Sequence, residues 1–521
     1  MVDRAIVSFA ISPFGGSWSY GNEHDARCQN ANSKQSLNCK GGAKEMRAAL
    51  NFLSEGEVEK THEASLRILK ETGVKIHSEK VRRLLAENGA EVDGGIAKIP
   101  GSLVEEAIRR APKEITLCAR EPKCDLRIPT DDCRFLSTSG FSPFITTNLE
   151  TGERRYSTSS DTKDFAIVGD YLDTVDCFWP TVIPGEVPPS LQELHALAIA
   201  LENNRKHIQC SCATKEAAKW QIRLAATIAG GEEELKKRPL FSTINCPVAP
   251  LTFEESASEA MVILAKAGIP TGPVTAVLAG ATAPATIAAA VAMGNAEELA
   301  SLVIIECAEP GAPMIYASEV APANMKTGEM NYQGSAYLLL SAAGAQMARF
   351  YKIPSLAADV SIEAVPSDLM SFERNVLKAA MHFMCKSDLS PSLGGCDVAM
   401  SASLDQLILD AEICEHARAY LRAFELNDDS LSFDIIHKVG PGGHFLGEKH
   451  TVEHFRKEIW NRDLSDTFVL DAAMEGSFVE RARAKVKEIL STHTPPPVAE
   501  GVHKEMERVL RDAKKDILGD D

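Results

Sequence analysis

The spacing of apolar and polar positions first becomes regular about fifty residues into the chain. From Ser54 onward, apolar side chains recur at helical spacing, and Ser54 with Glu57 has the pattern of a capping box, so a helix is expected to begin there. Gly73 is expected to end it. Two further helices, Glu79–Asn88 and Gly101–Arg110, and a short strand, Ile115–Ala119, follow in the prediction.

A different pattern begins near Arg134, where short apolar stretches alternate with longer stretches at helical spacing. This alternation is typical of βα units and a parallel sheet. Eight units predict a TIM (β/α)8 barrel, although the alternation alone fits an open doubly wound sheet equally well. The expected strands are Phe135–Thr138, Phe178–Ile183, His207–Cys212, Leu240–Asn245, Thr271–Ala276, Met314–Ser318, Ser355–Val360 and Ser390–Leu393.

These changes of pattern divide the chain into four parts. A Pro/Asp-rich segment, Glu121–Asp132, marks the boundary before the barrel. The fold class expected is therefore α/β, with an N-terminal helical domain and a C-terminal helical extension around the barrel. The four parts are a poorly ordered segment (1–45), the helical domain (46–125), the barrel (126–425) and a C-terminal segment (426–521).

Composition narrows the kinds of partner and compartment. The net charge of −18 and the pI near 5.3 argue against nucleic acid and anionic membranes as partners. The uncharged run Pro273–Asn295 consists mainly of small residues and contains Pro284, so it is expected to be a buried strand, loop and helix and not a membrane span. Thirteen cysteines without a dense framework indicate reduced thiols in a cytoplasmic protein.

One motif near the end of the chain has the composition of a site lid. Residues Val439–Thr451 read VGPGGHFLGEKHT, with four glycines and two histidines. Such backbone reaches positive φ and approaches a ligand closely. A surface turn with incidental histidines is the alternative.

The run GPGGHFLGEKHTVEHFR, Gly440–Arg456, resembles the C-terminal signature of the trimethylamine:corrinoid methyltransferase family, including its branch without pyrrolysine that acts on glycine betaine and related quaternary amines. Other segments match in the same order. They include LSEGEVEKTHEASLRILKETGVKI from Leu53, IPGSLVEEAIRRAPKE from Ile99, LQELHALAIALENNRKHI from Leu191, GATAP from Gly280 and PMIYASEVAPANMKTGEMNYQG from Pro313. The resemblance covers about Ala49 to Arg462 and implies the (β/α)8 fold.

The resemblance also implies an activity, the transfer of a methyl group from a substituted amine to the Co(I) of a corrinoid. No position is pyrrolysine, so a quaternary amine such as a betaine is favoured over trimethylamine. The corrinoid is expected on a cognate corrinoid protein, with no cofactor tightly bound to this chain, and a homo-oligomer is expected. The loop Ser361–Phe372 departs from the family pattern by becoming apolar, which fits a bulkier or less polar substrate.

Most candidate site residues follow from the rule that barrel chemistry lies at the carboxyl ends of the strands. Tyr332 is taken from the family-like stretch MKTGEMNYQG, and His444, Phe445 and His450 from the glycine-rich motif. Aromatic rings there attract a quaternary ammonium by cation–π contact, with core packing as the alternative role. Histidines would donate to a substrate carboxylate, and acidic groups would complement the cation or pair with a lysine. The catalytic candidates are His444, Glu319 and Asp359; the substrate-binding candidates are Tyr332, Phe141, Phe144, Trp179, Phe445, His450, Asn245 and Thr282, the last also being a candidate strand-to-helix cap.

Two other kinds of protein fit the same residues. One is a zinc-dependent methyltransferase on a similar barrel, with the metal held by His207, Cys210 or Cys212, although no metal site is our main expectation. The other is a non-catalytic relative that binds a betaine or a corrinoid protein.

Overall fold

The computed structural model describes residues 48–130, 135–140, 144–332, 334–357, 369–455, 458 and 476–519. The expected N-terminal segment, 1–45, lies outside these residues.

Eight parallel strands form a ring in which each strand lies beside the next barrel strand of the chain. The ring closes between the segments of the fifth and sixth barrel strands of the chain, where isolated bridges join Thr271 to Met314 and Thr275 to Ser318. This confirms the predicted barrel, and each predicted strand overlaps an observed one. The strands are β6 (Phe135–Thr138), β9 (Cys177–Phe178), β10 (His207–Ser211), β11 (Phe241–Ile244), β13 (Thr271–Gly272), β15 (Tyr316–Ser318), β17 (Ser355–Ala357) and β18 (Leu389–Leu393).

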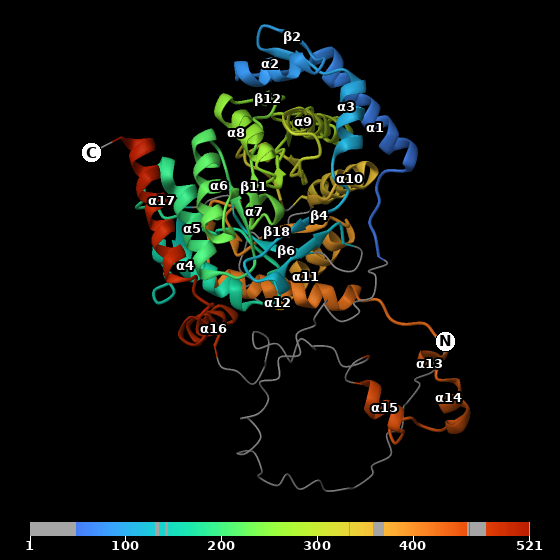
Figure 1. Cartoon of the computed structure of the whole chain (residues 1–521). Coiled ribbons are helices and arrows are strands. Elements are labelled where there is room, and N and C mark those ends of the chain that lie inside the picture. The colour runs from blue at the N-terminus through green and yellow to red at the C-terminus, as the bar shows by residue number, and fades with distance from the viewer. Residues whose placement is uncertain are drawn as a thin grey trace. The chain divides into compact units, whose positions relative to one another are not determined.

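A helix follows each barrel strand and covers the outside of the ring (Figure 1). Among the described residues, α9 is the one helix long and apolar enough to cross a membrane, and 83% of its apolar window is buried against the rest of the protein. Its apolar surface is therefore that of a core helix. The helices are α4 (Ser159–Tyr171), α5 (Gln192–Asn203), α6 (Lys215–Ala229), α8 (Glu255–Lys266), α9 (Ile287–Ala308), α10 (Ser335–Tyr351), α11 (Leu369–Met384) and α12 (Leu404–Leu421).

The amino-terminal end of the barrel is closed by a hairpin of β4 (Ile115–Leu117) and β5 (Leu126–Ile128). Its apolar side chains share one cluster with residues from the barrel interior. His207, the first residue of β10, also binds the backbone oxygen of Cys118 through Nδ1 at 2.7 Å. Access to the interior is therefore left to the carboxyl-terminal end.

The N-terminal helices are packed on the barrel helices. The predicted capping box is confirmed, since the N–H of Ser54 donates to the Glu57 carboxylate at 2.8 Å. Gly73 ends the helical run with φ of 76°, and a Cβ there would lie 2.7 Å from the oxygen of Ala97. The elements are α1 (Glu55–Arg67) and α3 (Gly101–Arg110), which contact α9, together with η1 (Ile68–Thr72), β1 (Val74–Ile76), α2 (Glu79–Glu87), β2 (Glu91–Asp93), β3 (Ile96–Lys98) and β12 (Thr252–Phe253).

Short strands follow several barrel strands and so lie at the carboxyl-terminal end. They are β7 (Ile145–Thr147), β8 (Arg154–Tyr156), β14 (Leu278–Ala279), β16 (Ala321–Pro322), β19 (Gly395–Cys396) and β20 (Ser401–Ala402). The remaining helices are η2 (Pro122–Cys124), η3 (Pro189–Leu191), α7 (Glu232–Lys237), α13 (Asp428–Leu431), α14 (Phe433–Val439), α15 (Lys449–His454), α16 (Phe478–Thr492) and α17 (Glu500–Leu518). Of these, α16 contacts α4 and α12, and α17 contacts α5 and α6.

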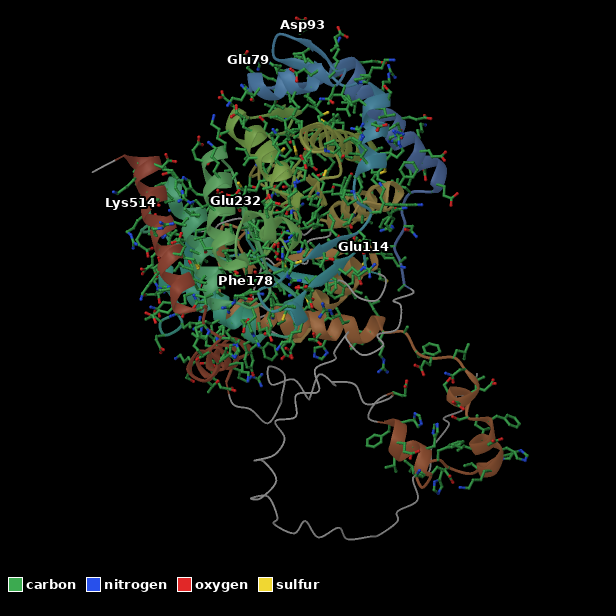
Figure 2. All side chains as sticks on the ribbon, viewed as in Figure 1. Glu79, Asp93, Glu114, Phe178, Glu232 and Lys514 are labelled. Carbon is green, nitrogen blue, oxygen red and sulfur yellow. The ribbon has the colours of Figure 1, made fainter. Side chains whose placement is uncertain are left out.

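Apolar side chains are buried and most charged ones are exposed, and Figure 2 labels six examples. Phe178 on β9 is completely buried in the layer between strands and helices. The labelled charged residues are exposed, namely Glu79, Asp93, Glu114, Glu232 and Lys514. A large core of this kind fixes the strand ends that carry the candidate site.

Candidate active site

A carboxylate and a phenol meet where β15 ends. Ile315 and Ala317 face the barrel interior, so Glu319 continues the same face at the carboxyl end of the strand. The hydroxyl of Tyr332 donates to Oε1 of Glu319 at 3.0 Å. Both side chains are buried, and the Tyr332 ring lies edge-on to that of Tyr337 with centroids 5.1 Å apart. The structure thus brings together two of the predicted site residues.

The indole of Trp179 lies on the other side of the ring of strands. Trp179 follows β9, which is the fourth neighbour of β15 in either direction around the barrel, so the two strand ends stand opposite each other. Its side chain belongs to the interior cluster and is 1% exposed. A Cβ at Gly140 would overlap the indole ring, so glycine is needed for this close approach. The hydroxyl oxygen of Thr138 accepts from the backbone N–H of Trp179 at 2.8 Å, which fixes the backbone of Trp179.

Cys246 lies near Glu319 at the same end of the barrel. It follows Ile244 of β11 by two residues, and its side chain is exposed. Burial and then the nearby Glu319 carboxylate raise the pKa of this thiol to about 12. Cys246 is therefore a neutral thiol at pH 7 and not a thiolate nucleophile.

Three other predicted residues lie at the strand ends without joining the pair of Glu319 and Tyr332. Asn245 donates through its amide to the backbone oxygens of Cys212 and Ala257, so it ties a strand end to α8. Thr282 accepts from the N–H of Leu278 at 2.9 Å and holds a turn. The residue that precedes the helix is Thr286, so the predicted cap role of Thr282 is wrong. Phe144 is 47% exposed immediately before β7.

The histidine motif forms a small region with its own contacts. Between residues 427 and 454, the hydrogen bonds, ion pairs and ring contacts that the structure records are made with residues of 425–454. His450 Nε2 lies 2.8 Å from Ser432 Oγ, and the His450 ring stacks on His454 at 4.2 Å. His444 is exposed and Phe445 is 44% exposed. Their proposed role in the site stays a prediction.

Asp359 and Phe141 lie outside the described residues, as does most of the loop Ser361–Phe372. The sequence analysis also missed residues that face the interior. Cys246 follows a predicted strand directly, and Gln209 stands within one. Alternation was the available signal for Gln209, because His207, Gln209 and Ser211 share one face of β10.

The zinc site of the alternative reading is not formed. Alternation along β10 places Cys210 on the helix-facing side with Cys212, and His207 on the interior face. Both ring nitrogens of His207 are used, by Cys118 O and by Ser242 Oγ at 2.9 Å. Across the described part of the chain, no group of three or more His, Cys, Asp or Glu side chains is placed to hold a metal ion.

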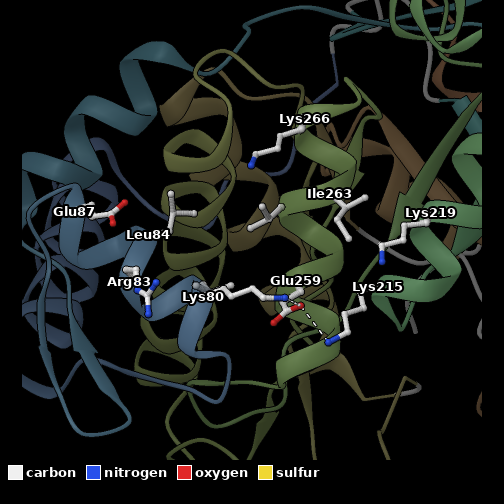
Figure 3. A pocket seen from close by; sticks show the side chains of 11 residues that line it. Lys80, Arg83, Leu84, Glu87, Lys215, Lys219, Glu259, Ile263 and Lys266 are labelled. Atoms are coloured by element: carbon white, nitrogen blue, oxygen red, sulfur yellow. Dashed lines mark hydrogen bonds and ion pairs between the residues drawn. The ribbon is translucent and has the colours of Figure 1, made fainter.

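A groove of about 400 Å³ lies outside the barrel, between α2, α6 and α8 (Figure 3). Figure 3 shows Glu259 between two lysines, with Lys80 Nζ at 3.1 Å and Lys215 Nζ at 3.2 Å from its carboxylate. Desolvation opposes the charge of Glu259, but the hydrogen bonds from Lys80, Ser78 and Lys215 leave its pKa lowered. This groove joins the N-terminal helices to the barrel and includes no interior residue of the strands.

The chain is similar to a known family of proteins along most of its length. Residues 21–517 match the model of the trimethylamine methyltransferase family, a longer match than Ala49–Arg462. A glycine betaine methyltransferase of Desulfitobacterium hafniense (strain Y51) is 29% identical over 471 residues, covering 90% of this chain and 98% of the relative.

Two further relatives carry the name trimethylamine methyltransferase. The protein of Desulfitobacterium hafniense (strain DSM 10664 / DCB-2) is 27% identical over 467 residues, covering 88% of this chain and 93% of its own. One from Methanosarcina mazei is 25% identical over 486 residues, covering 90% and 96%. The solved monomethylamine methyltransferase of Methanosarcina barkeri has 10% identity, covers 89% of each chain and gives a TM-score of 0.48.

The family match spans the N-terminal helices, every strand of the barrel and the C-terminal helices. This chain therefore belongs to the trimethylamine methyltransferase family.

Proposed function

We propose that this chain removes a methyl group from a quaternary amine of the betaine type and passes it to the Co(I) corrinoid of a partner protein. Two findings support the proposal. The chain belongs to a methyltransferase family and covers nearly the whole length of a relative named glycine betaine methyltransferase. The barrel mouth carries a buried carboxylate and phenol opposite an indole, which suits a permanent cation.

The chemistry requires little acid–base work from the protein. The methyl carbon forms a bond to the nucleophilic cobalt of the partner's corrinoid while the bond from that carbon to nitrogen breaks, and nitrogen keeps the bonding electron pair. The leaving group is a neutral tertiary amine and needs no proton. The residues of the mouth therefore bind and orient the cation and exclude water.

Glu319 and Tyr332 have distinct roles in this proposal. The Glu319 carboxylate attracts the ammonium group, and the hydroxyl of Tyr332 holds that carboxylate at 3.0 Å. Donation from Tyr332 also reduces the effective negative charge, so the cation is not bound so tightly that its loss of charge becomes costly. Trp179 offers the opposite wall. The cytosol is the proposed location, since thirteen cysteines without a dense spacing framework are typical of reduced thiols.

The pair of Glu319 and Tyr332 carries the proposal at residue level, and Glu319→Gln tests it. The variant keeps the size and the acceptor for Tyr332 but loses the charge. We expect KM for the quaternary amine to rise about tenfold or more with kcat within about threefold, because the charge acts before the positive charge is lost. Steady-state kinetics of methyl transfer give both constants.

Glu309→Gln is the matched control, because Glu309 is half-exposed and paired with Lys236 on the surface at 3.1 Å. It should leave both constants unchanged. Unchanged KM in a folded Glu319→Gln variant would remove Glu319 from the substrate site.

A further inference from the structure

Three neighbouring strands place Ser139, Trp179 and Gln209 side by side. Ser137 of β6 pairs with Cys177 of β9, and Cys177 pairs with His207 of β10. Two residues further along the same three chain segments stand Ser139, Trp179 and Gln209. Since the side-chain period of a strand is two, all three share the interior face of the barrel, as membership of Trp179 in the interior cluster shows.

The two polar members of this row are buried and unsatisfied. Ser139 and Gln209 are both 0% exposed. Within the part of the chain that the structure describes, Ser139 Oγ and both amide atoms of Gln209 have no hydrogen-bond partner. Leaving buried donors and acceptors unpaired is costly, and most native proteins avoid it. Three such atoms in one row indicate a place that a polar group occupies during function.

The residue of β10 that lies one step nearer the closed end has its polar atoms paired. His207 lies on the same face of β10, one step nearer the closed end, and both of its ring nitrogens have partners. The unpartnered atoms of Gln209 therefore lie one step along β10 from a residue whose ring nitrogens are both paired.

The chemistry of the row selects one kind of ligand group. A hydroxyl and a primary amide are neutral and can donate two or more hydrogen bonds to an anionic oxygen. The indole between them offers an aromatic face to a cation. Glu319 stands opposite Trp179 across the barrel and adds negative charge there. A molecule with a carboxylate near Ser139 and Gln209 and an ammonium group towards Glu319 would accept from Ser139 Oγ and Gln209 Nε2, and would leave Gln209 Oε1 as the one atom of the three that it does not pair.

We propose that Ser139 and Gln209 form a subsite inside the barrel that binds the carboxylate of the betaine-type substrate. This inference rests on the proposed function and deepens it by naming the residues that recognise the carboxylate. It separates zwitterionic betaines from quaternary amines that have no carboxylate.

Gln209→Leu and Ser139→Ala test the subsite by calorimetric titration of the full chain with glycine betaine and with tetramethylammonium. Wild type should bind glycine betaine at least tenfold more tightly than tetramethylammonium. Gln209→Leu should weaken binding of glycine betaine about tenfold or more while changing that of tetramethylammonium less than about threefold. Ser139→Ala should act in the same direction.

Gln221→Leu is the matched control, because Gln221 is a fully buried glutamine whose amide donates to Ser211 O from α6, outside the barrel. It should lower the thermal midpoint and leave the ratio of the two affinities unchanged. Gln209→Leu removes groups that have no partner, so its thermal midpoint should not fall. Folding failure therefore cannot imitate the expected result.

The outcomes separate the subsite from the proposed function. The subsite would be overturned if Gln209→Leu weakened the binding of both compounds equally. It would also be overturned if wild type showed no preference for glycine betaine or bound neither compound. Methyl transfer by wild type with an unaltered ratio in Gln209→Leu would keep the function and reject the subsite. A ratio that depends on Gln209, without methyl transfer, would keep the subsite and reject the function.

Discussion

Glu297 and Glu298, adjacent residues on the buried helix α9, are carboxylic acids whose environment sets their charge. Glu298 accepts from the N–H of Ala317, and burial raises its pKa well above the ordinary value. Glu297 accepts from the N–H of Leu251 at 2.7 Å, and burial raises its pKa to about 7. Leu251, which Glu297 holds, belongs to the segment that follows Cys246 at the mouth. The protonation of Glu297 therefore affects how firmly this segment is held.

Glu297→Gln should flatten the dependence of stability on pH. The folded pKa of Glu297 lies above its unfolded value, so its contribution is fully present below about pH 4.5 and is lost as pH rises through about 7. The Gln variant keeps an acceptor for Leu251 and does not titrate. Its stability relative to wild type should increase by about 3 kcal/mol between pH 4.5 and 7.5. Chemical denaturation across this range measures the difference, and a difference independent of pH would contradict the assignment.

At the scale of elements, Asp170 joins three segments that are far apart in the chain. It lies at the end of α4, accepts from the N–H of Arg205 at 2.7 Å just before β10, and pairs with His493 after α16 at 2.8 Å. Its side chain is fully buried. Burial opposes its charge, but the hydrogen bonds from Arg205 and His493 leave its pKa lowered. The C-terminal helices are therefore attached to the barrel partly through one carboxylate.

Asp170→Asn should destabilise the protein by about 3–5 kcal/mol, because Arg205 would lose its buried counter-charge. Glu202→Gln, which breaks only the surface pair with His503, should cost about 1 kcal/mol or less. The stability due to Asp170 is present above its unfolded pKa and is lost as pH falls through its lower folded pKa. Thermal unfolding of both variants at pH 7 and at about pH 2.5, below the unfolded pKa of Asp170, checks the size and the sign, and equal losses in the two variants would refute it.

The same scale shows what a single sequence can predict. The eight strands were predictable because each is a short apolar run between helical stretches. Two of them end early for a clear reason. Pro180 stops β9 and Pro273 stops β13, since proline has no N–H for the ladder. The predicted segment boundaries near residues 125 and 425 stay predictions.

The site was less predictable than the strands. Glu319 is predicted by the rule on strand ends, and Tyr332 by the family-like stretch MKTGEMNYQG after the same strand. Their hydrogen bond, however, depends on the course of the chain between them. Asn245 was expected at the mouth, yet it stands one residue after the interior Ile244 and its amide binds Cys212 O and Ala257 O. Gln209 lies inside a predicted strand, whereas the rule on strand ends selects only residues that follow one.

In the molecule as a whole, a closed barrel end and an opposite end that carries polar side chains define one direction of access. The hairpin of β4 and β5 seals the amino-terminal end. The carboxyl-terminal end carries Glu319, Tyr332, Trp179 and Cys246. A methyl group bound there can meet a corrinoid only from outside the barrel, which agrees with an acceptor delivered by a partner protein.

The most direct measurement mixes the purified chain with free Co(I) cobalamin and glycine betaine and follows methylation of the cobalt by its absorbance. We expect conversion that depends on the enzyme, yields dimethylglycine in equal amount and is slowed in Glu319→Gln at low substrate. Binding of glycine betaine without any conversion, with free cobalamin or with the cognate corrinoid protein, would contradict it and make the chain a non-catalytic member of its family.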